Sequence, residues 1–513
     1  MPHVRAMTGA LQWWQRVLLA LLVGWLFVLM VVASRDKAFW HDEIYTVLAS
    51  AMPPATLWRA SIDGVDLSPP LFTALTHLVR PVVGVGHIAT RLPSMAAFLV
   101  AAVVVFAMVR RRAGALVAFA AVLALASTEA WHFATEARGY SLTVAWFALV
   151  LLGWSEAAAG RRAAANLALM SIALAAGVWT HYYFVLALLP VAVGEGVRQL
   201  RGRRLEKAPW LAMGIAGVAM LGLLPLAEAA ASQRPAFWAR PQKPGVAGIY
   251  PYLHADFGLP HVVIALLLLL AAVQTLRRLR SRTWPLRVPL HEIAAGAVCL
   301  ALPALCALLG YFLQVFDQRY ATFTSAGLAI VIPVAIWVLT SDRGPGTALF
   351  AAAVAAGFVG TSIEAFHPPL WRDPYLTHPM LAQQLQAGRE IVVTGGADYL
   401  AYWYYAPDDE KGRVLYVADP VGQLRDTGRD TIDSGYVALA RWAPVPVRPL
   451  DDFLRSHASF LLYSPVPGWT EHTLALRGAT LTQVSGESTG SGVLYDVSTT
   501  ARPAARAPAP RAS

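Results

Sequence analysis

Two adjacent carboxylates, Asp42 and Glu43, follow the first long apolar run of the sequence, in the segment Phe39-Trp40-His41-Asp42-Glu43-Ile44-Tyr45. The run itself, residues 17–33, carries no charge and with its flanks is long enough to cross a bilayer. Ionised groups beside a membrane helix are costly and usually functional, and a carboxylate there can serve as a general base. The simpler alternative is that both residues cap an interfacial helix.

Arginine and aromatic side chains stand at the ends of later apolar runs, namely Arg138, His181, Tyr183, Arg319 and Tyr320. Arginine suits phosphate because its planar fork donates two parallel hydrogen bonds and stays charged. Arg319 follows an apolar run, so it is well placed for a lipid phosphate whose tail lies among helices. The alternatives are a structural pair between Asp317 and Arg319 or an interfacial anchor. We expect Asp66, just before Ser68-Pro69-Pro70, to be a turn residue.

The composition predicts the class of protein and the helices that position these residues. The chain has 513 residues, of which 57% are hydrophobic and 14% charged, with a mean hydropathy of +0.51, as in a polytopic membrane protein of two or more domains. About eleven membrane helices are expected: residues 17–33, 92–109, 116–126, 141–152, 165–180, 184–193, 210–226, 262–276, 293–316, 322–339 and 348–363. The net charge of +10 does not indicate nucleic-acid binding, because the arginines cluster in short loops between these runs.

The basic clusters fix the expected topology. With the N-terminus in the cytoplasm, alternation puts all of them inside, as the positive-inside rule requires: Arg110-Arg111-Arg112, Arg161-Arg162, residues 198–207, residues 277–287 and Arg343. The candidate site residues then share the non-cytoplasmic side. Residues 17–33 lack a clear cleavage site and are expected to be a retained helix.

Three regions are predicted along the chain. Residues 1–365 form the membrane domain, and its first outer loop, residues 34–91, carries short interfacial helices at 42–52 and 70–80. Residues 366–500 form a small outer α/β domain, with strands at 390–394, 413–418 and 460–463 and helices at 398–405, 450–456 and 471–477. The tail, residues 501–513, is rich in Ala, Pro and Arg and is expected to be disordered.

These motifs resemble the polyprenol-dependent GT-C membrane glycosyltransferases, in the bacterial branch with the protein-mannosyltransferase-like domain (glycosyltransferase family 39). The resemblance covers residues 17–365 and rests on the order of Trp40-His41-Asp42-Glu43, Ser68-Pro69-Pro70-Leu71, Arg91-Leu92-Pro93-Ser94, Glu136-Ala137-Arg138-Gly139-Tyr140-Ser141-Leu142, Thr180-His181-Tyr182-Tyr183 and Arg319-Tyr320. It implies a mainly α, polytopic helix bundle of GT-C type in the bacterial inner membrane.

The resemblance also implies an activity and roles for residues. A sugar would pass from a polyprenyl-phosphate donor to an acceptor, a glycolipid, polysaccharide or protein, on the non-cytoplasmic face. The acidic reaction-centre position maps onto Asp42, with Glu43 beside it. Arg138 and Arg319 match positions that hold the lipid phosphate, and His181, Tyr183 and Tyr320 are expected pocket residues.

One base and one direct displacement predict inversion at the anomeric carbon. No tightly bound metal or other cofactor is expected, since Asp42, Glu43 and His181 match no ligand spacing, although they could ligate a divalent ion.

Three other classes stay open: a transporter or flippase of lipid-linked saccharides, a polysaccharide polymerase or ligase of unrelated fold, and a non-enzymatic scaffold with an outer sensor domain. A transporter would place polar residues near the bilayer midplane, whereas here they stand at loop ends. A polymerase or ligase would carry its long loop between late helices, whereas here the long loop follows the first.

Overall fold

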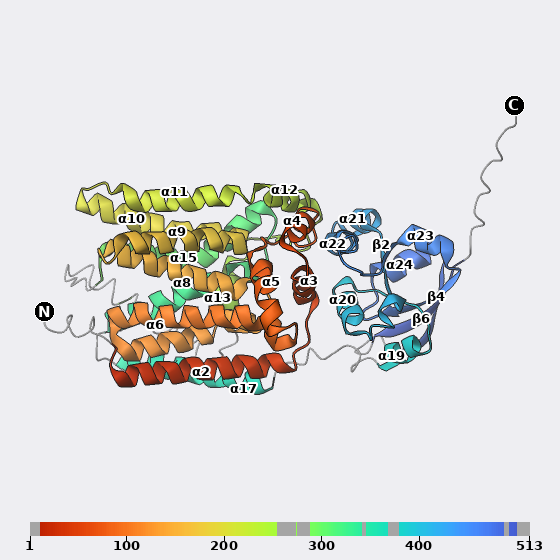
Figure 1. The fold of residues 1–513 in the computed structure, drawn as a ribbon, viewed down its shortest axis with the longest axis horizontal. Helices are drawn as coiled ribbons and strands as arrows, with labels where there is room; N and C mark the ends of the chain where they lie inside the picture. The colour runs from red at the N-terminus through yellow and green to blue at the C-terminus, as the bar shows by residue number, and fades with distance from the viewer. Residues whose placement is uncertain are drawn as a thin grey trace, which may run out of the picture.

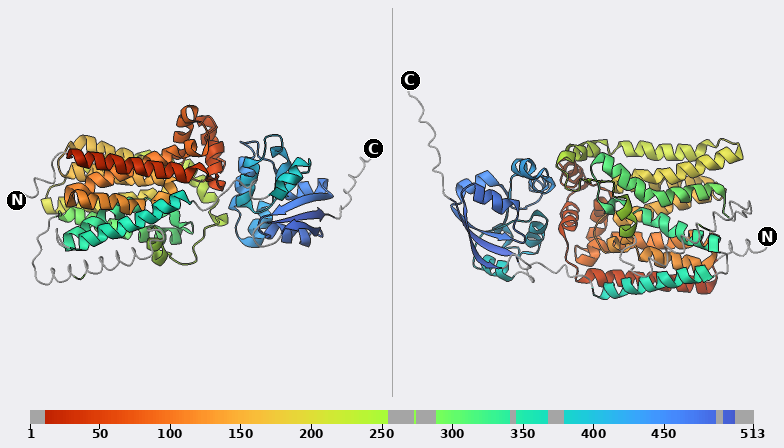
Figure 2. Two further views of the ribbon diagram at one scale, coloured as in Figure 1. Left: turned by 90° about the horizontal axis from the view of Figure 1, so that it is seen from below. Right: turned by 180° about the vertical axis from the view of Figure 1, so that it is seen from behind.

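The computed structural model describes residues 11–253, 273, 288–340, 345–367, 379–486 and 492–499. Long helices lie side by side in a bundle, and a smaller α/β domain lies beyond one end of it (Figure 1). The two further views place this domain beyond the same end (Figure 2). The short helices that follow the first long helix lie between the bundle and the α/β domain (Figure 1).

The bundle is made of apolar helices joined mostly by short turns. They are α2 (Trp13–Arg35), α6 (His87–Ala126), α8 (Tyr140–Ala158), α9 (Ala163–Thr180), η1 (Tyr182–Ala187), α10 (Leu188–Gly202), α11 (Lys207–Leu221), α12 (Leu224–Ser232), α15 (Leu290–Leu313), α16 (Thr324–Thr340) and α17 (Pro345–Phe366). In the part of the chain that the structure describes, seven helices are long and apolar enough to cross a membrane, or eight if the bent pair α11–α12 is one span.

This architecture agrees with the predicted helix bundle. α6 is interrupted at Gly114, whose φ of +85° suits glycine, and its two parts match the predicted runs 92–109 and 116–126. The other predicted runs also coincide with described helices, except 262–276, which apart from residue 273 lies outside the described residues.

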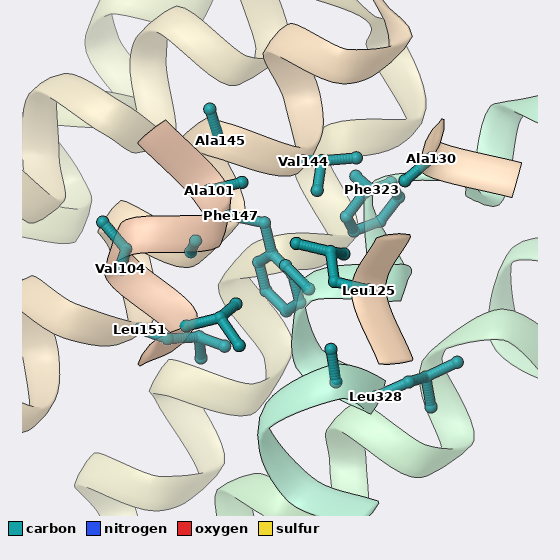
Figure 3. Close-up of a cluster of buried hydrophobic side chains, with 14 of the residues drawn as sticks. Ala101, Val104, Leu125, Ala130, Val144, Ala145, Phe147, Leu151, Phe323 and Leu328 are labelled. Atoms are coloured by element: carbon teal, nitrogen blue, oxygen red, sulfur yellow. The ribbon is translucent and has the colours of Figure 1, made fainter. Parts of the chain in front are cut away.

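The bundle core is closely packed around Phe147 of α8 (Figure 3). The Phe147 ring meets those of Phe184 and Phe323, with centroids 6.3 and 5.4 Å apart. A Cβ at Gly327 of α16 would lie 2.9 Å from the Phe147 ring, so glycine is what allows this approach. Small residues let membrane helices come close, because contact rather than the exclusion of water drives their association.

Ion pairs tie the basic loops together at one end of the bundle. Glu156 near the end of α8 binds both Arg111 of α6 and Arg161 of the next turn, and Arg112 binds Glu292 at the start of α15. The opposite ends of α8, α9 and α15, which carry Tyr140, Thr180 and Leu313, lie on the side of the α/β domain (Figure 1). The clusters at residues 277–287 and Arg343 lie outside the described residues.

Short helices build the end of the bundle beside the α/β domain. They are α3 (His41–Ala49), α4 (Pro54–Ile62), α5 (Leu71–Val83), α7 (Glu129–Ala134), η2 (Arg234–Ala236), α13 (Val246–Leu253) and η3 (Gln318–Ala321). α3 and α5 match the helices predicted in the first outer loop. α4 was not predicted; it starts at a proline, which fits the first turn of a helix.

The α/β domain contains a six-stranded sheet of order β3-β2-β1-β4-β6-β5. β3, β2, β1 and β4 run parallel, while β6 is antiparallel to β4 and β5. Its elements are α19 (Pro379–Gln386), β1 (Ile391–Val393), α20 (Gly396–Tyr405), η4 (Lys411–Arg413), β2 (Val414–Ala418), α21 (Pro420–Thr427), α22 (Thr431–Leu439), β3 (Val447–Pro449), α23 (Leu450–Ser456), β4 (Ser459–Ser464), α24 (Trp469–Leu476), β5 (Thr480–Gly486) and β6 (Val493–Ser498).

Every strand and helix predicted in this region is present, but β3, β5, β6 and several helices were missed. β1 and β2 are buried along their whole length, as expected for inner parallel strands, and so read as apolar runs. One face of the sheet carries α20 and α22 and shares its apolar core with α3 and α4. The domain is thereby packed directly against the helix that carries Asp42.

Candidate active site

α3 presents the two carboxylates in its first turn. It begins after Trp40, whose backbone N–H donates to the Glu43 carboxylate at 3.4 Å. Acidic residues are favoured at this end of a helix because its unpaired N–H groups are partly positive. Adjacent residues on a helix point in different directions, so Asp42 and Glu43 enter different surroundings.

Glu43 is enclosed in the protein. Its carboxylate oxygens accept from Arg91 Nε and Nη2, both at 2.7 Å, and neither side chain is exposed at all. The backbone N–H of Ala137 donates to the same carboxylate at 2.6 Å. Glu43 is therefore a buried partner of Arg91 and does not line the cavity described below, and its predicted catalytic role beside Asp42 stays a prediction.

Asp42 points instead to Arg319, which is far away in sequence. Arg319 Nη1 donates to Asp42 Oδ2 at 3.0 Å, and Asp317 Oδ1 lies 3.4 Å from Arg319 Nε. The Asp317–Arg319 pair that we considered as an alternative is therefore present alongside the contact with Asp42. Arg319 Nε is buried and makes no hydrogen bond, so its contact with Asp317 is an ion pair alone.

Arg138 lies on the other side of Asp42. Its guanidinium donates to Asp66 Oδ2 at 3.0 Å, to Ser68 Oγ at 3.1 Å and to the backbone oxygen of Asp42 at 3.3 Å. Burial opposes the charge on Asp66, but Arg138 and hydrogen bonds from Ser68 outweigh it and lower its pKa. Asp66 also accepts the Ser68 N–H, as a turn residue does, and in addition it holds Arg138.

These residues line one cavity of about 530 Å³ at the end of the bundle. Its walls come from segments that are widely separated in sequence. Predicted site residues in the wall are Asp42, Arg138, His181, Tyr183, Arg319 and Tyr320. The structure thus brings together every predicted site residue except Glu43.

Aromatic rings surround the two arginines. His181 lies against Tyr320 and Tyr183, with ring centroids 4.8 and 5.9 Å apart, and the Tyr183 hydroxyl donates to the backbone oxygen of Val315. The Arg319 guanidinium carbon lies 5.4 to 5.8 Å from the ring centroids of Trp40, Tyr140 and Trp238. Such rings stabilise a cation and at the same time keep it partly dry, so its attraction for an anion is screened less.

The sequence did not identify several wall residues. Trp238 stands in an outer loop with no motif around it, and a set of wall residues comes from the α/β domain, namely Ala397, Thr431, Ile432, Ser434 and Gly435. Tyr140 lies in a quoted motif, but nothing in its type or spacing distinguished it. Arg91 lies in another quoted motif, and its charge could have suggested an ion pair with Glu43.

The arrangement can bind an anion and remove a proton at one place. Two arginines offer donors to a phosphate, and Asp42 offers an acceptor for a hydroxyl proton. Among the described residues there is no group of three or more His, Cys, Asp or Glu side chains that could hold a metal ion.

No family model and no curated protein matches the sequence. ArnT from Cupriavidus metallidurans in the apo state aligns with a TM-score of 0.58 at 14% identity, covering 93% of this chain and 97% of that one. The same protein bound to undecaprenyl phosphate aligns at 0.57 and 15%, with the same coverage.

An oligosaccharyltransferase from Archaeoglobus fulgidus aligns at a TM-score of 0.43 and 11% identity, over 74% of this chain and 60% of that one. The likeness to ArnT, in contrast, runs through nearly the whole of both chains. The chain therefore has the fold of ArnT, a polytopic helix bundle of GT-C type with a C-terminal domain, as the resemblance predicts.

Proposed function

We propose that this protein is an integral-membrane glycosyltransferase that moves a sugar from a polyprenyl-phosphate donor to an acceptor hydroxyl. The observation that carries the proposal is the meeting of Asp42, Arg138 and Arg319 in one cavity at the end of an apolar bundle. The fold supports it, because the ArnT structure that aligns along nearly the whole chain is bound to undecaprenyl phosphate. The acceptor class, a glycolipid, polysaccharide or protein, stays open.

The proposed chemistry follows from the charges. The sugar–phosphate bond already has a phosphate as leaving group, so the protein must stabilise that phosphate and deprotonate the acceptor. Arg319 and Arg138 would hold the phosphate by charge-assisted hydrogen bonds. An arriving phosphate competes with Asp42 for Arg319 and so releases the Asp42 carboxylate to act as base.

A single displacement of this kind inverts the anomeric carbon. The acceptor oxygen bonds to that carbon as the bond to the phosphate oxygen breaks, and the acceptor proton passes to Asp42. NMR of the product would contradict this scheme if it showed the anomeric configuration of the donor retained.

We place the cavity on the non-cytoplasmic face of a bacterial inner membrane, with the N-terminus in the cytoplasm and the α/β domain outside. The support is the concentration of Arg111, Arg112 and Arg161 at the opposite end of the bundle from Asp42. We also propose that turnover needs no tightly bound divalent metal. Activity that is lost on chelation and restored by one ion would contradict this second point.

The experiment that tests the proposal uses purified full-length protein, a panel of polyprenyl-phosphate sugars and a membrane lipid extract as acceptor, with release of free polyprenyl phosphate as the readout. Asp42→Asn should lower turnover by about 10²–10⁴-fold, the usual contribution of a general base, while binding of undecaprenyl phosphate survives. Asp408→Asn, at an exposed position of the α/β domain, is the matched control and should leave turnover unchanged.

Two results would overturn the proposal. One is a wild-type protein that releases no polyprenyl phosphate from any donor. The other is Asp42→Asn turning over as fast as wild type, as expected of a transporter or scaffold in which Asp42 has no chemical role.

A further inference from the structure

The cavity is closed on one side by the α/β domain. Ala397 at the start of α20 and Ser434 and Gly435 in α22 line the same space as Asp42 and Arg319. α20 and α22 belong to the domain that lies beyond the end of the bundle, so this wall faces the arginines from the side away from the apolar helices (Figure 1).

Specific contacts fix this wall in place. Thr431 is the first residue of α22. Its hydroxyl accepts a hydrogen bond from the backbone N–H of Trp238 and donates one to the backbone oxygen of Ala236, both at 3.1 Å. The N–H of Asp430 donates to the same Ala236 oxygen at 2.9 Å. These bonds join the start of α22 to the loop that places Trp238 over Arg319.

A second set of contacts joins α22 to α3. The Tyr436 hydroxyl makes a hydrogen bond of 3.1 Å with His41 Nδ1, and the Tyr436 ring stacks on Tyr45 at 6.3 Å with 9° between the planes. A Cβ at Gly435 would lie 3.2 Å from the Tyr45 hydroxyl, so the two helices are in close contact. The wall is therefore a built part of the cavity, at a fixed distance from Asp42.

The position of the phosphate determines which part of the donor molecule faces this wall. A polyprenyl tail has to remain with the apolar bundle, and its phosphate with Arg319 and Arg138. The sugar attached to that phosphate then extends away from the bundle, toward Ala397 and Ser434. The wall contains the small residues Ala397, Ser434 and Gly435, with Thr431 and Ile432 beside them in α22. Trp40 and Trp238 add apolar ring faces nearby, as is common in pockets for small ligands.

We infer that the start of α20 and the N-terminal half of α22, through Ala397, Ser434 and Gly435, form the wall that selects the donor sugar by its size. The inference rests on the proposed function and extends it: the membrane domain binds the lipid phosphate, and the α/β domain restricts which sugar is transferred.

The test measures binding by full-length protein of undecaprenyl phosphate and of the same lipid carrying arabinose, glucose or N-acetylglucosamine. Ala397→Leu and Ala397→Phe fill the cavity from α20 in two steps, and Ser434→Leu fills it from α22. Ala475→Phe, at an exposed position of α24, is the matched control.

Undecaprenyl phosphate should bind all four variants as it binds wild type, which also shows that they fold. The three wall variants should bind the sugar-bearing lipids at least about tenfold more weakly, and the loss should grow with the size of the sugar and from Leu to Phe at position 397. The control should bind every lipid as wild type does.

Two outcomes overturn the inference but leave the proposed function intact. In one, the wall variants bind the three sugar-bearing lipids with the wild-type order and strength. In the other, sugar binding is unchanged and only the use of acceptors of different size is altered, so that the wall serves the acceptor. A wild-type protein that binds none of the four lipids would instead contradict the proposed function itself.

Discussion

The carboxylate of Glu43 and the guanidinium of Arg91 form a two-point ion pair from which solvent is fully excluded, with both contacts at 2.7 Å. Arg91 also donates to the backbone oxygens of Ser34, in the last turn of α2, and of Lys37 and Ala38, in the segment that connects α2 to α3. The pair therefore holds the start of α3 against α6 and fixes the residue next to Glu43, which is Asp42.

Glu43→Gln should destabilise the protein strongly. The substitution keeps the size of the side chain but leaves Arg91 as a buried charge without a counterion, which costs about 3–5 kcal/mol in comparable pairs. We expect thermal unfolding in detergent to show a loss of this order. The matched control is Glu206→Gln, since Glu206 pairs with Arg198 at a half-exposed site, where the expected loss is below about 1 kcal/mol. Equal losses in the two variants would contradict a structural role for Glu43.

The pH dependence of stability should report on His41. Burial lowers the pKa of His41 below its ordinary value of 6.5; Asp42 opposes this shift, and Arg138 and Arg319 add to it. The unfolded chain then binds more protons than the folded one as the pH falls below 6.5, so the free energy of unfolding decreases there. At higher pH both states are neutral at this residue and its contribution is constant.

The measurement is the difference in thermal midpoint between wild type and His41→Gln from pH 5 to pH 8. Wild type should lose stability relative to the variant as the pH falls. A wild type that gains stability relative to His41→Gln on acidification would show that the pKa is shifted upward instead.

Tyr436→Phe should slow turnover without weakening lipid binding. The substitution keeps the ring that stacks on Tyr45 but removes the hydroxyl that meets His41 and Gly396. We expect kcat to fall by about tenfold, about the worth of one hydrogen bond, because α3 and Asp42 are positioned less well. The KM for the donor and the affinity for undecaprenyl phosphate should not change.

Tyr495→Phe on β6 serves as control, since Tyr495 packs on the other face of the sheet. A Tyr436→Phe enzyme with wild-type kcat would mean that the contact is not needed to position Asp42.

Much of the bundle could be predicted from the sequence, because a membrane helix depends mainly on local composition. The runs that became α2, α8, α9 and α15 are apolar along their whole length, and the basic loops between them are distinctive. β5 and β6 were missed because neither is apolar along its whole length. β5 contains Thr, Gln, Ser and Gly and pairs only at the edge of the sheet.

The site could be predicted only in part. Asp42 and Arg319 are ionised residues at helix ends, which is a local signal, but their contact at 3.0 Å joins segments 277 residues apart. The different fates of Asp42 and Glu43 depend on which direction each faces from α3, and sequence adjacency does not reveal that. Ser434 and Gly435 carry no chemical signal, and only the packing of α22 against α3 puts them in the cavity wall.

We propose that Arg319 beside Asp42 binds the phosphate of a polyprenyl donor, and the decisive measurement is equilibrium binding of undecaprenyl phosphate to Arg319→Gln. Arg161→Gln, at the opposite end of the bundle, is the matched loss of one arginine from an ion pair with a glutamate. Arg319→Gln should bind at least about tenfold more weakly than wild type, as expected when a charge-assisted hydrogen bond is lost, and Arg161→Gln should bind as wild type does. Wild-type affinity in Arg319→Gln, or an equal loss in both variants, would contradict it.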